Sequence, residues 1–122
     1  MKRASGLQRL LNASRYSCLG LKAAWRGQAS FRQEVAALAV LVPCAFFLGT
    51  NATQRALLLL SLLLIPLAEL VNSAIEAIVD RIGLEEHPLA GQAKDIGSAA
   101  VLVALVAAAV VWALVAGERF GA

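Results

Sequence analysis

The residues best suited to chemistry are four polar side chains within one long apolar stretch: Glu69, Asn72, Glu76 and Asp80. Their spacing of three, four and four residues places all of them on one narrow stripe of an α-helix. Carboxylates are costly in hydrocarbon, so acidic side chains in a segment of membrane-spanning length indicate a functional site.

Glu69 and Glu76 suit two different tasks. Mg²⁺ prefers oxygen ligands and is usually held by one or two carboxylates together with phosphates of the substrate. A carboxylate in a less polar setting has the raised proton affinity that a general base needs. Asn72 could orient either group by hydrogen bonding. Two alternatives stay open, namely a polar cluster that only specifies helix association and a proton or ion relay in a small transporter.

Lys94 and Asp95 stand at the start of the last apolar segment, on the same side as the acidic stripe. A lysine near a metal-bound carboxylate neutralises the charge of a polyphosphate, and Asp95 could orient that lysine or hold water. The alternative is an ordinary solvated charge pair at a helix start. His87 fits a solvated loop residue better than a ligand. The chain has neither a Walker-type phosphate loop nor a dinucleotide-binding glycine motif.

Composition predicts an all-α membrane protein of one domain. The 122 residues are 60% hydrophobic and have a mean hydropathy of +0.74, above the usual range of soluble proteins. Residues 35–68 carry one charge, Arg55, and residues 96–117 carry none. Three short spans cannot enclose a large core, so a homo-oligomer is the natural way to bury polar groups within the membrane.

The hydrophobic pattern predicts an amphipathic surface helix over about residues 6–27 and spans over about 31–48, 53–82 and 92–116. Ser30 and Gln33 match a capping box that would open the first span. The second span is about 45 Å long, so its last turns should emerge from the roughly 30 Å hydrocarbon core. Gly83 should end that helix, and residues 84–91 should form a polar loop.

The charge distribution predicts the orientation. Residues 1–34 carry seven basic residues against one acidic residue, Glu34. The N-terminus should therefore be cytoplasmic and the C-terminus outside; the family resemblance given below implies a bacterial inner membrane and a periplasmic C-terminus. These basic residues suit lipid headgroups or a nucleotide better than nucleic acid. Charges interrupt residues 1–34, which therefore do not fit a cleavable signal peptide, and Cys18 and Cys44 are best explained by packing.

Two blocks of the sequence resemble the prokaryotic diacylglycerol kinases, which are small integral-membrane lipid kinases. The first is Glu-Leu-Val-Asn-Ser-Ala-Ile-Glu-Ala-Ile-Val-Asp-Arg-Ile-Gly at residues 69–83, and the second is Ala-Lys-Asp-Ile-Gly-Ser-Ala-Ala-Val at residues 93–101. Residues 23–25 and 29–34 resemble a third block of the family. The likeness covers nearly the whole chain. It implies a homotrimer with active sites shared between subunits, in which MgATP phosphorylates diacylglycerol to phosphatidic acid.

By position, the resemblance makes Glu69 the general base with Asn72 close by, and Glu76 a Mg²⁺ ligand. The residues that it places around ATP are Arg9, Tyr16, Gln28, Glu76, Glu85, Glu86, His87, Lys94 and Asp95. Those that it places around the lipid are Ser14, Arg15, Ser17, Lys22, Trp25, Ser30, Phe31, Arg32, Glu34, Arg55, Glu69, Ser98 and Trp112.

One position departs from the family pattern. The family usually has glutamate where this chain has Gln28, and that glutamate joins the residue matching Glu76 in holding the metal. Gln28 keeps an oxygen ligand but lacks the negative charge, which implies a weaker metal site, a substitute carboxylate or reduced activity. Undecaprenol kinases of the same family are the rival within this class. Outside it, the rival is a non-enzymatic ion or proton relay.

Overall fold

The computed structural model describes residues 5–83 and 87–121, which form four α-helices and no strand. The helices are α1 (Gly6–Gly27), α2 (Ala29–Leu48), α3 (Ala52–Ile82) and α4 (Pro88–Phe120). The last three are long and apolar enough to cross a membrane. The expected all-helical fold with three candidate spans is therefore confirmed.

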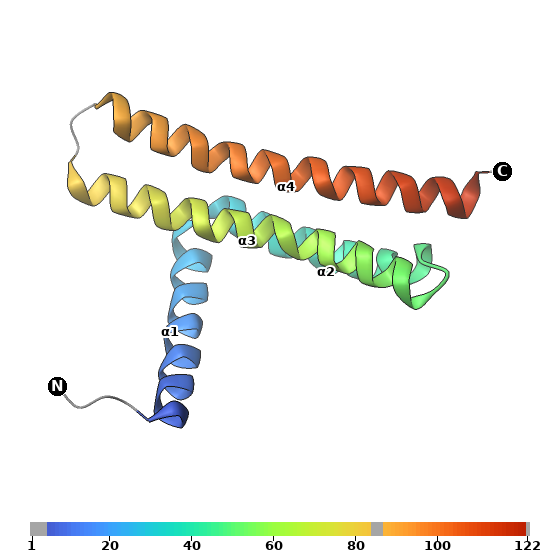
Figure 1. The fold of residues 1–122 in the computed structure, drawn as a ribbon, viewed down its shortest axis with the longest axis horizontal. Coiled ribbons are helices and arrows are strands. Elements are labelled where there is room, and N and C mark those ends of the chain that lie inside the picture. The colour runs from blue at the N-terminus through green and yellow to red at the C-terminus, as the bar shows by residue number, and fades with distance from the viewer. Residues whose placement is uncertain (1–4, 84–86, 122) are drawn as a thin grey trace.

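The three long helices lie side by side in an elongated, antiparallel bundle, and α1 projects away from it (Figure 1). α3 is the central helix, because it packs extensively against α4 and also against α2, whereas α2 and α4 scarcely touch. The last turns of α3 and the first turns of α4 extend past the junction of α1 and α2. Polar residues on these turns are therefore not covered by α1 or α2 of the same chain.

Side chains at the helix starts explain most of the boundaries. Ser5 Oγ accepts a hydrogen bond from the Gln8 amide at 3.1 Å, and Asn51 Oδ1 accepts one from the Gln54 amide at 2.8 Å. Both are standard N-caps, which satisfy amides that have no partner inside the helix. Gly83 follows the last residue of α3, as expected from its position.

Two expectations about helix starts are wrong. α2 begins at Ala29 without a side-chain cap, and Ser30 does not form a capping box because its hydroxyl is bonded to Glu69 instead. Residues 88–91 belong to α4 and not to a loop. His87 Nδ1 accepts a hydrogen bond from the Leu89 amide at 3.1 Å, and Pro88 occupies the first helical turn, where its missing N–H costs nothing.

The hydrophobic core lies in the half of the bundle nearest the α2–α3 turn. Ala45, Leu58 and Val115 bring one buried residue from each of the three long helices into contact. Trp112 packs on this cluster, and its indole N–H donates to Ser61 Oγ at 3.1 Å. The polar row of α3, formed by Glu69, Asn72, Glu76 and Asp80, lies toward the other end of this helix.

Candidate active site

Glu69 is the one buried acidic residue among those that the structure describes, at 8% exposed. Ser30, in the first turn of α2, donates its hydroxyl to Glu69 Oε1 at 2.9 Å. The carboxyl group of Glu34 lies close enough to that of Glu69 to interact with it electrostatically. Ser30 and Glu34 are four residues apart and so share one face of α2. Glu34 Oε2 is buried and has no hydrogen-bond partner in the part of the chain that the structure describes.

One turn further along α3, Asn72 and Glu76 form a second polar pair. Asn72 is 7% exposed, and its Nδ2 donates to Glu76 Oε1 at 3.4 Å. Its Oδ1 is buried and accepts no hydrogen bond from any described residue. Glu76 is half-buried. The amide therefore orients the Glu76 carboxylate, as expected from their spacing of four residues.

The end of the row is an ion pair between helices. Lys94 Nζ lies 2.6 Å from Asp80 Oδ1, and both side chains are about half-exposed, at 43% and 58%. The sequence suggested Asp95 as a group that could orient Lys94 or hold water, and in the structure Lys94 is paired with Asp80 instead. Neighbouring residues on a helix point in different directions, so Asp95 is exposed while Asp80 on α3 reaches the lysine. Asp80 was visible in the stripe, but its partner depends on how α3 and α4 pack.

The row orders three kinds of chemical group along α3. The Glu69 carboxylate, with a hydroxyl donor, lies at the inner end of the row. The Asn72 amide and the Glu76 carboxylate follow, and Lys94 with its counter-ion Asp80 forms the outer end. From Glu69 to Asp80 the rise is about 16 Å along the helix axis. Such an order suits proton acceptance at the inner end, a hard cation in the middle and phosphate at the outer end.

Gln28 lies at the junction of α1 and α2. It lines a groove of about 640 Å³ between α1 and α3, opposite Ser73 and Ala77 on the face of α3 beside the polar row. Apart from Gln28 and three serines or glycines, small and apolar side chains line it. Residues 5–83 and 87–121 contain no cluster of three acidic, histidine or cysteine side chains that could hold a metal.

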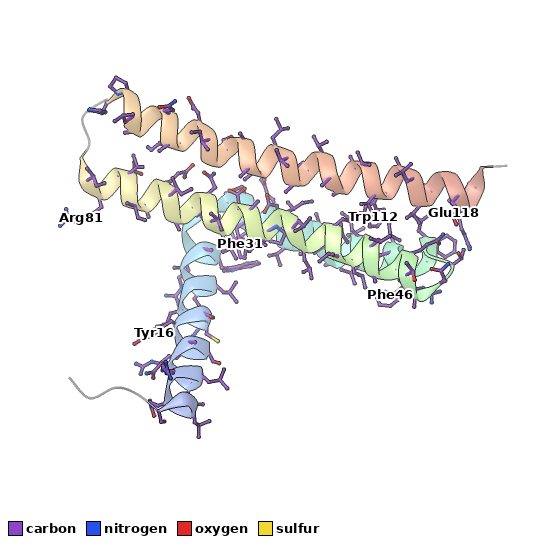
Figure 2. All side chains as sticks on the ribbon, in the orientation of Figure 1. Tyr16, Phe31, Phe46, Arg81, Trp112 and Glu118 are labelled. Carbon is purple, nitrogen blue, oxygen red and sulfur yellow. The ribbon has the colours of Figure 1, made fainter. Side chains whose placement is uncertain are left out.

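Several residues expected at the ATP or lipid site lie apart from the polar row or are exposed. On α1, seven of them are exposed: Arg9, Ser14, Arg15, Tyr16, Ser17, Lys22 and Trp25. Tyr16 lies on α1 apart from the other helices, and Trp112 lies at the end of the bundle opposite Arg81 (Figure 2). Arg55 donates to the Phe46 carbonyl oxygen at 3.2 Å, at that same end.

The other residues expected at the ATP or lipid site make contacts within this chain or are exposed. Arg32 donates to the carbonyl oxygens of Trp25 at 2.6 Å and Arg26 at 3.3 Å, and so ties α2 to the end of α1. Phe31 is buried, and Ser98 is exposed on α4. His87 caps α4. Glu85 and Glu86 lie outside the described residues.

The fold and the site together define a class: a small helical membrane protein in which acidic and amide side chains lead from the bundle interior to a lysine at one end. The family model described as prokaryotic diacylglycerol kinase matches residues 15–116. A diacylglycerol kinase of Pseudomonas aeruginosa is 52% identical over 114 residues, 93% of each chain.

Two further diacylglycerol kinases give the same result. The protein of Escherichia coli is 47% identical over 117 residues, which is 96% of each chain. That of Haemophilus influenzae is 45% identical over 112 residues, or 92% of this chain and 95% of the relative. The chain therefore belongs to the prokaryotic diacylglycerol kinase family, and the resemblance drawn from its sequence blocks is confirmed. It is an enzyme, so the non-enzymatic relay is set aside.

Proposed function

We propose that this chain transfers the γ-phosphoryl group of ATP to the free hydroxyl of diacylglycerol, giving phosphatidic acid and ADP. The observation that carries the proposal is the buried Glu69, held by Ser30 at the inner end of a polar row that ends at Lys94. The relatives named diacylglycerol kinase cover nearly the whole chain, and this supports the lipid as substrate.

Glu69 is the general base in this proposal. Its carboxylate takes the hydroxyl proton of the lipid while the hydroxyl oxygen attacks the γ-phosphorus. The bond from that phosphorus to the bridging oxygen breaks, and ADP leaves with the electron pair. Ser30 holds Glu69 Oε1 at 2.9 Å, so the second carboxylate oxygen is available to accept the proton.

Lys94 neutralises the charge of the transferring group and of the departing diphosphate. In the structure Lys94 is paired with Asp80 at 2.6 Å, half-exposed to solvent. A surface ion pair of this kind contributes only about 0–1 kcal/mol. Lys94 therefore exchanges this partner for phosphate oxygens at little cost, and Asp80 keeps the ammonium group near the phosphate site when ATP is absent.

Mg²⁺ fits the oxygen groups of two residues, Glu76 in the middle of the row and Gln28 apart from it. Glu76 offers one carboxylate, oriented by Asn72, and Gln28 offers a neutral amide oxygen. This is the sparse protein ligand set with which Mg²⁺ binds substrate phosphates. When bound, the ion would offset negative charge on the β- and γ-phosphates. Gln28 lies in the α1–α3 groove rather than on the polar row, which is consistent with a contribution from a neighbouring subunit.

A homotrimer with shared sites and the N-terminus in the cytoplasm completes the proposal. Large apolar side chains in the spans are uncovered, among them Val103 at 67% and Leu114 at 70% exposed, and such surfaces face lipid or other subunits. α1 carries Arg9, Arg15, Lys22 and Arg26, which suit the anionic cytoplasmic leaflet of a bacterial inner membrane. α1 would then lie in the interface, with the C-terminus periplasmic.

The decisive test is Glu69→Gln, with transfer of radiolabel from the γ-phosphate of ATP to diacylglycerol in mixed micelles. General base catalysis contributes about 10²–10⁴-fold, so kcat should fall by at least about 10²-fold while the oligomer seen by size-exclusion chromatography is unchanged. Glu118→Gln, at the far end of α4, is the matched control. Normal turnover in Glu69→Gln would exclude Glu69 as the base. Competition between undecaprenol and diacylglycerol in the same assay distinguishes a diacylglycerol kinase from an undecaprenol kinase.

A further inference from the structure

Gly97 marks a very close approach of α4 to the polar row of α3. It is buried, in contrast to most of the residues around it on α4. A methyl group built on Gly97 would overlap Asn72 Oδ1 and would lie 3.2 Å from Asn72 Cγ and 3.6 Å from Ile75 Cδ1. Only a residue without a side chain allows the backbone of α4 to lie against the Asn72 amide.

This contact determines which way the Asn72 amide faces. Its oxygen is directed at Gly97, and its Nδ2 therefore faces along α3 to Glu76 Oε1 at 3.4 Å. The oxygen is buried without a partner among the residues that the structure describes, so hydrogen bonding at that oxygen does not account for this orientation. Packing of α4 at position 97 supplies the constraint.

We propose that Gly97 is a positioning residue for phosphoryl transfer, acting through Asn72 to hold the Glu76 carboxylate in place. The inference rests on the proposed function, in which Glu76 binds the metal of the nucleotide. Since Oδ1 is the far end of a rotatable side chain, an added methyl group would displace the amide rather than separate the helices. The loss would therefore fall on the Glu76 site more than on the fold.

The test is Gly97→Ala, assayed with Mn²⁺ as a paramagnetic substitute for Mg²⁺ and a non-hydrolysable ATP analogue. Mn²⁺ affinity, from the free-ion signal in electron paramagnetic resonance, should fall about five- to tenfold, the scale of one typical protein hydrogen bond. The Mg²⁺ concentration for half-maximal rate should rise similarly, with the KM for diacylglycerol unchanged. Gly91→Ala, on the same helix with open space around its Cα, should change neither value.

A second pair of variants keeps the inference testable if Gly97→Ala does not assemble. Asn72→Ala makes room for the methyl group, so Gly97→Ala should have no effect on Mn²⁺ binding in an Asn72→Ala background. Further weakening in that double variant would overturn the inference, as would unchanged Mn²⁺ affinity in Gly97→Ala alone. A wild-type enzyme that binds Mn²⁺ with the analogue yet transfers nothing to diacylglycerol would contradict the proposed function and leave the binding comparison intact.

Discussion

Ser30 reaches the candidate base from another helix, and this makes the Glu69 carboxylate an oriented group rather than a freely rotating one. A hydroxyl that donates to a carboxylate is worth about 1.5–3 kcal/mol when the carboxylate is charged. Glu34, four residues further along α2, brings a second carboxyl group to the same point. A hydroxyl donor at Glu69 Oε1 favours the charged form of that carboxylate beside the second acidic group.

Ser30→Ala should lower kcat by about tenfold, the scale of one such hydrogen bond, because Glu69 Oε1 loses the donor that holds it. Ser30→Thr retains the hydroxyl and should restore most of the rate. Steady-state kinetics with diacylglycerol in mixed micelles give kcat and KM separately. The family resemblance places Ser30 among lipid contacts, and in that case KM would rise while kcat stayed constant.

Gln28 stands where the family resemblance leads us to expect a glutamate. Gln28→Glu should lower the Mg²⁺ concentration for half-maximal rate about fivefold, because one added charge near a partly solvated cation contributes about 1 kcal/mol. The measurement is a Mg²⁺ titration of the initial rate at saturating ATP. Gln33→Glu adds the same charge on the exposed face of α2 and is the control. An unchanged Mg²⁺ requirement in Gln28→Glu would mean that position 28 is not a ligand.

At the scale of the helices, the polar row itself could be predicted because residues 69, 72 and 76 share one face of a single helix whatever the helix packs against. Its partners could not be predicted. The Ser30–Glu69 hydrogen bond joins residues 39 apart in sequence, and the Lys94–Asp80 pair depends on the register of α4 against α3. Local patterns instead favoured Asp95 as a group that could orient Lys94, whereas the structure pairs Lys94 with Asp80. They also predicted a capping role for Ser30, and this was wrong.

Trp112 and Ser61 connect α4 to α3 in the half of the bundle away from the polar row. The indole N–H donates to Ser61 Oγ at 3.1 Å, and the same hydroxyl donates to the Leu58 carbonyl oxygen at 2.8 Å. Hydrogen bonds between membrane helices contribute about 0.6 kcal/mol on average. The contact stabilises the apolar end of the bundle and leaves the indole ring packed on its core.

A double-mutant cycle of Ser61→Ala and Trp112→Phe should therefore show a coupling free energy of about 0.6 kcal/mol, measured by unfolding in mixed detergent and sodium dodecyl sulfate. Ser61→Ala alone should leave the KM for diacylglycerol unchanged. The resemblance places Trp112 at the lipid site. A raised KM in Trp112→Phe, with no coupling to Ser61, would support that placement over the helix contact.

At the scale of the whole molecule, α1 is the part least integrated with its own chain. It projects from the bundle (Figure 1), and the residues that the family resemblance places near ATP, Arg9 and Tyr16, are exposed on it. The polar row is carried by α3 and α4. α1 of one subunit could instead complete the ATP site at the polar row of the neighbouring subunit. A single chain would then not form a complete active site.

Mixing two inactive proteins tests this arrangement. Subunits with Arg9→Ala and Tyr16→Ala retain an intact polar row, and Glu69→Gln subunits retain an intact α1. After unfolding and refolding together in equal amounts, about a quarter of the sites in a cyclic trimer should combine an intact α1 with an intact row. Activity should therefore recover to about a quarter of the wild-type value, measured by phosphate transfer to diacylglycerol.

The control is refolding of each variant alone, which should leave activity near zero. A site formed within a single subunit would give no recovery on mixing, because every subunit would still carry one defective part. Full activity of the α1 variant by itself would instead remove Arg9 and Tyr16 from the ATP site. Recovery near a quarter distinguishes sharing between neighbours from both of these results, since it requires the two parts to come from different chains.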